Sequence, residues 1–376
     1  MSHLFQTYAR ADTTLVNGQG ATVVDATGKS YLDFGAGIGV VNLGYHHPAV
    51  QAAVENQLQK IWHTSNLYQS PLQEKVAEQL VGDDDKLVFF ANSGAEANEA
   101  ALKLARKYTG KHKLLNFENA FHGRTYGALA LTPVLAYQAG YGVDDDVVTA
   151  PFNDFASLDL LDESFAAVML EVVQGEGGIH VADVAWVQAL VAKAQALGVL
   201  VIVDEVQSGM GRTGYLYAYQ AFGIEPDIVT VAKALANGLP VGAMIGHAAL
   251  GTVFQPGAHG TTFGGNPVVM SSALAVLKTL NPIFLEAVKQ KSAAAVGFLI
   301  TQTADMPQVK EVRGTGLMLG LELTVDVNLV VAKLRENGIL ALSAKGNTLR
   351  LLPVLTMSQA DLLAGLQVIL DTIGGF

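Results

Sequence analysis

One lysine lies in a stretch of sequence that is otherwise almost free of charge. The segment DIVTVAKALANGLPVG, residues 227–242, has no charged side chain after its opening aspartate except Lys233. A β-branched apolar run precedes this lysine, and small residues including Gly238 follow it. An ammonium group in such a setting is costly unless it is paired, solvated or neutral. Because desolvation lowers the pKa of a lysine, this position favours a neutral, nucleophilic amine.

Two other polar groups also follow apolar runs. Asp204 ends the run VLVIVD, so the sequence predicts a carboxylate at the end of a buried strand, either paired with a cation or in a surface turn. After KLVFF, which ends at Phe90, the segment NSGAEANEAALKLAR has small residues and then helical spacing. Ser93 and Glu96 match the capping-box pattern. This helix start is either an ordinary cap or a phosphate site built from bare backbone N–H groups.

Taken together, the three groups favour one chemistry. Residues 93–95, Asp204 and Lys233 each follow a separate predicted strand, and open α/β sheets bind ligands at the carboxyl ends of their strands. Pyridoxal 5′-phosphate needs a phosphate-binding helix end, a carboxylate for its pyridinium nitrogen and a lysine that forms a Schiff base. The spacing therefore favours a site for this cofactor.

Other chemical motifs are weak or absent from the sequence. Gly209, Gly211 and Gly214 match G-x-G-x-x-G, but no acidic residue ends a second strand about 20 positions later, as a dinucleotide site requires. The sequence has no Walker A, H-E-x-x-H or G-x-S-x-G motif. The aspartate triplets at 83–85 and 144–146 are interpreted as solvated loops, with calcium binding as the alternative. We expect no metal site.

The elements that must position these groups alternate along the chain. Apolar runs near 86–90, 113–117, 165–173, 199–203 and 227–232 predict strands, and helical spacing covers 95–110 and 184–198. The strands lack in/out alternation, which is typical of a mostly parallel sheet with helices on both faces. Helical segments near 268–280 and 283–304 then lead to a smaller α+β unit. We expect an N-terminal segment (1–45) that packs with the small domain, a large domain (46–270) and a small C-terminal domain (271–376).

Composition limits the classes of partner. The 376-residue chain has a formal net charge of −11, which argues against a nucleic-acid or anionic-membrane partner. It has no cysteine, which excludes disulfides and thiolate metal sites and is compatible with a reducing compartment. Residues 234–277 contain no Asp, Glu, Lys or Arg, but glycine and proline break them into pieces too short for a membrane span. The N-terminus has no signal-peptide pattern, so we expect a cytoplasmic protein.

Six motifs resemble, in order, those of the class III (ornithine/acetylornithine-type) aminotransferases of fold type I. They are NSGAEANEAALKLAR, FHGRT, QGEGG, DEVQSGMGRTG, DIVTVAKALANGLP and HGTTFGGNP, and the likeness runs over nearly the whole chain. The resemblance implies an α/β fold, pyridoxal 5′-phosphate as cofactor and a homodimer with shared active sites. The cofactor contacts that it implies are Ser93, Gly94, Ala95, Phe121, Asp204, Glu205, Val206, Gln207, Lys233 and Thr262.

The resemblance also implies a role for several of these residues. Lys233 would anchor the cofactor and move protons, Asp204 would bind its pyridinium nitrogen, and Gln207 would bind its ring hydroxyl. Phe121 would stack on the ring. Thr262 would complete the phosphate site of the other subunit.

Substrate roles follow from the same resemblance. Arg124 would bind the α-carboxylate of acetylornithine, and Arg350 that of glutamate or 2-oxoglutarate, because the guanidinium fork suits carboxylates. Thr261 would lie near the substrate. Glu176 would cover Arg350 while the ω-amino substrate is bound, with a purely structural ion pair as the alternative.

One residue helps to choose among substrates. Ornithine aminotransferases resemble the stretch around Ile38 but have a tyrosine at this position. An apolar residue here suits an acylated amine. The resemblance therefore implies transfer of the δ-amino group of N2-acetyl-L-ornithine to 2-oxoglutarate in arginine biosynthesis. Val172 departs from the family's usual proline, and GYHHP departs from its commoner GHxHP. Ornithine, succinyldiaminopimelate, succinylornithine or 4-aminobutyrate as substrate, an aminomutase, and a non-catalytic binding protein remain alternatives.

Overall fold

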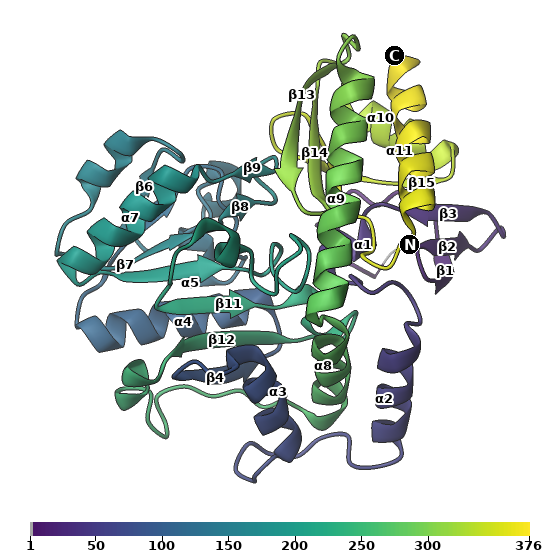
Figure 1. The fold of residues 1–376 in the computed structure, drawn as a ribbon. Helices are drawn as coiled ribbons and strands as arrows, with labels where there is room; N and C mark the ends of the chain where they lie inside the picture. Colours follow the sequence, from purple (N-terminus) through teal and green to yellow (C-terminus); the bar gives the residue numbers. More distant parts are fainter. Residues whose placement is uncertain (1–2) are drawn as a thin grey trace.

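A central sheet organises the large part of the protein, which we describe over residues 3–376 from a computed structural model (Figure 1). Its strands lie in the order β4 (Lys86–Ala91), β12 (Gly242–His247), β11 (Ile228–Val231), β10 (Leu200–Asp204), β7 (Phe165–Leu170), β5 (Lys113–Phe117) and β6 (Val147–Ala150). Strand β12 runs antiparallel to its neighbours β11 and β4, and the other neighbouring strands of this sheet pair in parallel. The predicted mostly parallel sheet is confirmed.

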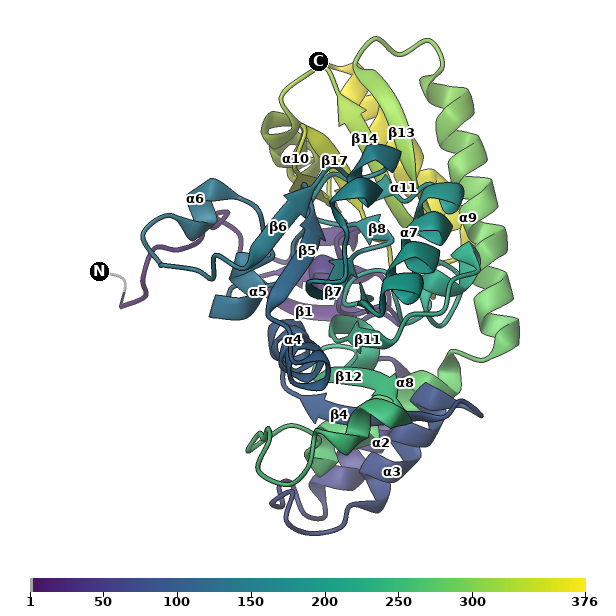
Figure 2. The same ribbon diagram turned by 90° about the vertical axis from the view of Figure 1, so that its left-hand side faces the viewer.

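Helices cover both faces of the sheet, as predicted. Helices α4 (Gly94–Thr109) and α7 (Val184–Leu197) lie on opposite sides of it in Figure 2. Alternate residues of β10 join different hydrophobic clusters: Ile202 packs with residues of α4, and Val201 and Val203 pack with residues of α7. Every residue of β7, β10 and β11 is buried, which explains why their sequences show no alternation.

Further helices flank the β4 edge and lead to the C-terminal part. Helices α2 (Pro48–Leu58) and α3 (Pro71–Val81) pack against α8 (Pro267–Thr279), and α9 (Pro282–Thr303) follows α8. Within residues 3–376 no single helix is long and apolar enough to cross a membrane; α8 and α9 pass that test only together, with a bend of 69° between them.

The C-terminal part has its own sheet and its own hydrophobic core. Strands β13 (Val309–Thr315), β14 (Met318–Leu323), β17 (Thr348–Leu351) and β16 (Leu342–Ala344) form an antiparallel sheet. Helices α10 (Val327–Glu336) and α11 (Gln359–Gly374) accompany it at the top of Figure 1. Buried residues of these elements form a cluster with Phe34 and Ala36, which lie near the N-terminus.

The N-terminal strands are joined to this C-terminal part. Strands β1 (Leu15–Gln19), β2 (Thr22–Asp25) and β3 (Ser30–Asp33) form a small sheet, and β15 (Ile339–Leu340) adds to it in parallel with β3. The apolar run GILALSA, residues 338–344, has the composition of a single strand but is divided between two sheets, as β15 and β16. The domain boundaries at residues 46 and 271 stay predictions.

The short element that follows β3 has an unusual backbone. Residues Ala36–Gly39, labelled α1, all have positive φ, with values of 47° at Ala36 and 67° at Ile38. L-residues disfavour this left-handed region by roughly 1–2 kcal/mol each. The carboxylate of Asp33 accepts hydrogen bonds from the N–H groups of Gly35 and Ala36 and so stabilises the turn.

The remaining short segments connect these elements near the sheet edge. They are α5 (Tyr126–Ala130), α6 (Leu135–Gln138), β8 (Val173–Gln174) and β9 (His180–Val181), with the 3₁₀ helices Phe155–Leu160, Ala218–Phe222, Lys233–Ala236 and Ala248–Thr252.

Candidate active site

A cavity of about 440 Å³ lies at the carboxyl ends of β4, β10 and β11. Since β4 and β11 both run antiparallel to β12, their carboxyl ends meet at one edge with that of β10. This topology brings together groups that are far apart in the sequence. The predicted residues that line the cavity are Ser93, Gly94, Ala95, Phe121, Arg124, Asp204, Val206, Gln207 and Lys233.

The start of helix α4 forms one wall. The Ser93 hydroxyl accepts a hydrogen bond from the Glu96 N–H (3.2 Å), but the Glu96 carboxylate accepts from the Asn92 N–H (2.7 Å) and not from Ser93. One half of the predicted capping box is therefore present, and in the other half the Glu96 carboxylate binds the N–H of Asn92, one residue before Ser93. In the described chain no group accepts a hydrogen bond from the Gly94 or Ala95 N–H, so these donors remain for an anion.

Gly94 is packed too closely for any side chain. A Cβ atom at this position would lie 2.7 Å from Cγ1 of Val206, which is another lining residue. The bare backbone thus lets a ligand reach the N–H groups of the first helical turn.

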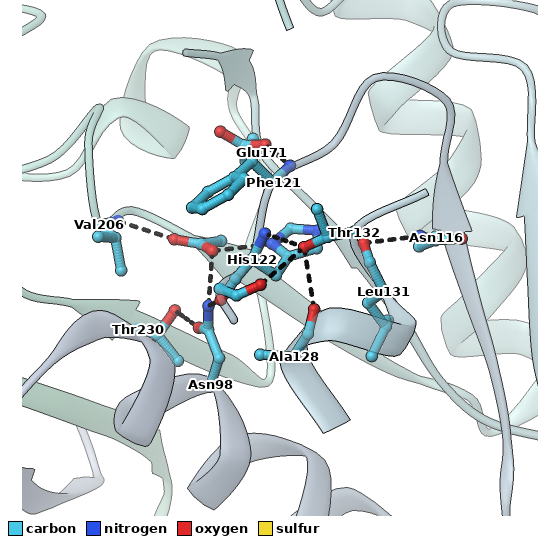
Figure 3. Close-up of polar contacts among 12 residues, drawn as sticks. Asn98, Asn116, Phe121, His122, Ala128, Leu131, Thr132, Glu171, Val206 and Thr230 are labelled. Carbon is cyan, nitrogen blue, oxygen red and sulfur yellow. Dashed lines mark hydrogen bonds and ion pairs between the residues drawn. The ribbon is translucent and has the colours of Figure 1, made fainter. Parts of the chain in front are cut away.

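Asp204 is fixed by three hydrogen bonds beneath the cavity. Its Oδ1 accepts from the Val206 N–H (2.9 Å), and its Oδ2 accepts from the Asn98 side chain (2.8 Å) and lies 2.8 Å from Nδ1 of His122. The network continues through Asn98 Oδ1, which accepts from the Thr230 hydroxyl (2.6 Å; Figure 3). Asp204 is only 3% exposed, so this network sets its orientation.

His122 and Asn98 were missed by the sequence reasoning. His122 is buried, and burial by itself would lower its pKa, but the hydrogen bond and charge of Asp204 outweigh burial and raise the pKa. Its Nε2 has no hydrogen-bond partner within residues 3–376. No local pattern singles out these residues, since they meet Asp204 only through the fold (Figure 3).

Glu171 is a second buried carboxylate at the cavity. Its oxygens accept hydrogen bonds from the N–H groups of Phe121 (2.9 Å) and Gly175 (3.2 Å), and it lies beside the ring of Phe121 in Figure 3. Burial raises its pKa, and the charge of Asp204 adds to that effect. It directly follows the buried strand β7, so the signal that identified Asp204 could also have found Glu171.

Lys233 begins a 3₁₀ turn directly behind β11. Its φ is 42°, in the left-handed region, and its side chain is half-buried. Burial lowers the pKa of the amine, while the nearby Glu176 carboxylate partly opposes this shift. Nothing within residues 3–376 forms a hydrogen bond or ion pair with Nζ.

Gln207, Glu176 and Arg350 form a polar cluster beside the cavity. Nη1 of Arg350 lies 2.5 Å from Oε1 of Glu176 and donates to the Gln207 side-chain oxygen at 3.1 Å. Burial would raise the pKa of Glu176, but Arg350 outweighs it and lowers that pKa. The predicted pair is thus in contact, with Arg350 only 2% exposed.

The other predicted substrate residues lie nearer the surface. Arg124 is exposed, and its guanidinium carbon lies 3.5 Å from the centre of the Tyr137 ring. Thr261 and Thr262 line a different cavity of about 770 Å³. The Thr261 hydroxyl accepts a hydrogen bond from Asn92 (3.0 Å), which connects that cavity to the end of β4.

Glu205 does not line the cavity. Its buried carboxylate accepts hydrogen bonds from the N–H groups of Ala218 and Tyr219 and from the hydroxyl of Ser208. Burial raises its pKa to about 7. These contacts fix the turn after β10, and the structure does not place this predicted cofactor contact among the residues that line the cavity.

The residues of this cavity fit pyridoxal 5′-phosphate. The N–H groups of Gly94 and Ala95, which have no acceptor in the described chain, suit a phosphate, because Gly94 has no side chain to block its approach. The oriented carboxylate of Asp204 suits a pyridinium nitrogen, and the amine of Lys233, which has no partner in the described chain, suits an aldehyde.

Known proteins resemble the chain over nearly its whole length. It is 54% identical over 372 residues to acetylornithine aminotransferase of Lactiplantibacillus plantarum, covering 98% of this chain and 96% of that protein. It is 48% identical over 375 residues to the enzyme of the same name from Streptococcus mutans, covering 98% of each.

Solved structures of aminotransferases also superpose on almost the whole chain. Ornithine aminotransferase of Toxoplasma gondii superposes with a TM-score of 0.93 at 31% identity, covering 99% of this chain and 92% of that one. A second structure of that enzyme reports partial occupancy of PLP at its active site. N-acetylornithine aminotransferase of Stenotrophomonas maltophilia superposes with a TM-score of 0.86 at 32% identity, covering 98% and 97%. The model of the aminotransferase class-III family matches residues 7–373, and the chain therefore belongs to the class-III aminotransferases, which depend on pyridoxal 5′-phosphate.

Proposed function

We propose that this protein transfers the δ-amino group of N2-acetyl-L-ornithine to 2-oxoglutarate, giving N-acetyl-L-glutamate 5-semialdehyde and L-glutamate in arginine biosynthesis. The observation that carries the reaction class is the amine of Lys233, which has no partner in the described chain and lies at the same cavity as the oriented carboxylate of Asp204. Relatives named acetylornithine aminotransferase, 45–54% identical over almost the full chain, support the substrate.

Each lining residue has a separate role in this proposal, either in binding the cofactor or in moving a proton. Gly94 and Ala95 would bind the phosphate of the cofactor, Asp204 its ring nitrogen and Lys233 its aldehyde carbon. Bound pyridoxal 5′-phosphate supplies an electron sink that makes the amine-bearing carbon of the substrate acidic. Released when the substrate amine takes its place, Lys233 would accept a proton from that carbon at Nζ and would give it to the former aldehyde carbon, for which its burial-lowered pKa is suited. Asn98 and His122 keep the Asp204 carboxylate aimed at the cavity.

Two arginines would bind the substrates in turn. Arg124, exposed at the cavity, would hold the α-carboxylate of acetylornithine. Glu176 would cover Arg350 at that stage and leave it when 2-oxoglutarate brings its own carboxylate. Their 2.5 Å contact supports this role, since it neutralises Arg350 until a competing carboxylate arrives.

Ornithine is the second candidate substrate. The superposition on the Toxoplasma gondii ornithine aminotransferase, with a TM-score of 0.93, favours it. Against it stands Ile38, which is 42% exposed on the left-handed turn close to the cavity residue Val40. An apolar side chain offers no partner to a free α-ammonium group but tolerates an acylated amine.

A homodimer belongs to the proposal. Large apolar side chains near Thr262 are exposed, among them Leu67 (91%), Tyr68 (72%) and Phe263 (62%). Leu67 lines the 770 Å³ cavity together with Thr262. Such a patch suits a second copy of the chain, which would place Thr262 at the partner's cofactor phosphate. A cytoplasmic location, which suits the cysteine-free sequence, is part of the same proposal.

A half-reaction with acetylornithine alone tests the function. We expect the purified holoenzyme to release N-acetylglutamate 5-semialdehyde without 2-oxoglutarate, in an amount equimolar with the enzyme, and to retain the amino group. The kcat/KM for acetylornithine should exceed that for ornithine. A higher value for ornithine would replace the proposed substrate, and no product from either amine would refute the reaction class.

A further inference from the structure

Hydrogen bonds fix the loop that carries Glu176 at both of its ends and to the C-terminal part of the chain. The Gly175 N–H donates to Glu171 (3.2 Å), and the Ile179 N–H donates to the Gln174 carbonyl (2.9 Å). Between these ends, two carbonyl groups accept hydrogen bonds from the C-terminal part of the chain. The Glu176 carbonyl accepts from the Lys345 N–H (3.1 Å), and the Gly178 carbonyl accepts from Nε of Arg313 (3.1 Å). The backbone of this loop is therefore anchored, and only the side chain of Glu176 is left to move.

Arg313 connects this loop to the strand that carries Arg350. It lies on β13 with its side chain only 8% exposed, and it forms ion pairs with Glu311 (2.6 Å) and Glu322. Its Nη2 donates to the Thr348 hydroxyl (2.9 Å). Thr348 lies two residues before Arg350 on β17, so both side chains point to the same face of that strand. One guanidinium thus fixes the position of the Glu176 loop relative to Arg350.

This arrangement creates a competition for Arg350. A dicarboxylate substrate that binds Arg350 must displace Glu176, which already occupies Nη1 at 2.5 Å. An anchored loop holds Glu176 at a high effective concentration next to its partner, whereas a loose loop lowers that concentration. The more firmly the loop is anchored, the more the displacement of Glu176 reduces the net affinity of Arg350 for the incoming carboxylate.

We propose that Arg313 is a positioning residue that keeps Glu176 on Arg350 and thereby weakens the binding of the 2-oxo acid substrate. This inference rests on the proposed function, in which Arg350 receives the carboxylate of that substrate. It predicts a gain of affinity when the anchor is removed. General loosening of the structure would instead lower affinity, so the sign of the change separates the two explanations.

Glutarate, a five-carbon dicarboxylate without a reacting group, is the probe. Its Kd for the holoenzyme is measured by isothermal titration calorimetry. In Arg313→Gln we expect glutarate to bind about fivefold more tightly than in wild type, a change in the range found when contacting residues are uncoupled. Glu176→Gln should bind it more tightly too, and adding Arg313→Gln to that variant should change nothing further. Arg350→Met should lose most of the affinity.

Lys310→Gln is the matched control. Lys310 lies on the same strand and pairs with the same Glu322 (2.7 Å), but its side chain is 67% exposed and reaches no part of the Glu176 loop. We expect its Kd for glutarate to equal that of wild type, and thermal melting checks that Arg313→Gln is folded at the assay temperature.

Three results would overturn the inference: weaker or unchanged binding in Arg313→Gln, an effect that persists when Glu176 is glutamine, or binding that Arg350→Met leaves intact. The proposed function fails separately, because it depends on the reaction with acetylornithine and the glutarate measurement does not.

Discussion

Lys233 combines an unusual backbone with an unusual side-chain environment. A φ of 42° is disfavoured for any residue with a side chain, and strain of this kind is concentrated at functional sites. Burial lowers the pKa of its amine, so a larger share of the side chain is neutral at a given pH. The sequence indicated this residue because a charge in an apolar run is rare. Its approach to Asp204 depends on how β10 and β11 pair, which one segment alone does not reveal.

Replacing Lys233 should separate folding from turnover. We expect Lys233→Ala to lose at least about 100-fold in kcat, since it removes the group that moves the proton. Thermal melting should stay close to that of wild type. Lys278→Ala, an exposed lysine on α8, serves as the control and should keep full activity. Turnover of Lys233→Ala within a few-fold of wild type would contradict its assigned role.

His122 should give the stability of the protein a pH dependence. Asp204 and Glu171 both face His122 and raise its pKa above the ordinary 6.5, so the folded protein keeps a proton that the unfolded chain releases. Stability from this group is therefore complete below pH 6.5 and is lost as pH rises through the folded-state pKa.

In His122→Asn we expect a loss of about 2 kcal/mol in the free energy of unfolding at pH 6.5, typical of a hydrogen bond to a charged group. The difference from wild type should shrink as pH rises. Urea unfolding at several pH values between 6.5 and 8.5 measures it. A difference that is constant with pH would show that His122 is not charged in the folded protein.

Among the elements, buried strands and capped helices were predictable, and edge or mixed strands were not. The runs KLLNF and VLVIV are apolar throughout because helices cover both of their faces. Strand β13 mixes charged and apolar residues, because the largely buried side chain of Arg313 pairs with Glu311 of the same strand, so its sequence lacks a strand pattern. Strand β12 lies inside the charge-free stretch 234–277, where no local signal shows where the strand begins or ends. The polar network around Asp204 joins four separate elements and could not be derived from spacing.

The first turn of α4 should be sensitive to a single methyl group. In Gly94→Ala the new Cβ would meet Val206 at 2.7 Å, so the turn must shift away from its position at the cavity. Overpacking of this kind costs about 1–3 kcal/mol, and we expect about tenfold weaker binding of pyridoxal 5′-phosphate to the apoenzyme. Titration followed by absorbance measures this affinity.

Gly297→Ala is the matched control for Gly94→Ala. Gly297 lies in the exposed middle of α9, where an added Cβ meets no atom within 4 Å. This change should leave cofactor affinity unaltered and stabilise the helix by about 0.5–1 kcal/mol. Equal cofactor affinity in the two alanine variants would refute the phosphate-binding role of the α4 turn.

For the whole molecule, the exposed apolar patch near Thr262 is the proposed dimer interface. We expect Leu67→Asp to shift the protein from dimer to monomer in analytical ultracentrifugation, because a charge placed at the centre of an apolar interface is poorly tolerated. Activity should fall with the dimer fraction. Leu329→Asp, at an exposed leucine of α10 far along the chain, should leave both unchanged. A Leu67→Asp variant that remains dimeric would place the interface elsewhere.

The antiparallel strand β12 also determines when the protein can complete its fold. Strand β4, at residues 86–91, has its only sheet neighbour within the described chain at residues 242–247, and β3, which pairs early with β2, gains its second neighbour only at residues 339–340. These contacts are long-range in sequence, and such contacts form slowly. During synthesis the edge of β4 therefore stays unpaired until more than 150 further residues have emerged, a count that follows from the separation of 91 and 242. Asp204 and Lys233 follow the directly paired strands β10 and β11, and Asn98 joins α4 to Asp204, but β4, which leads into α4, is held in the sheet only by β12. We therefore expect the phosphate-binding turn to be fixed, and the cofactor captured, late in folding.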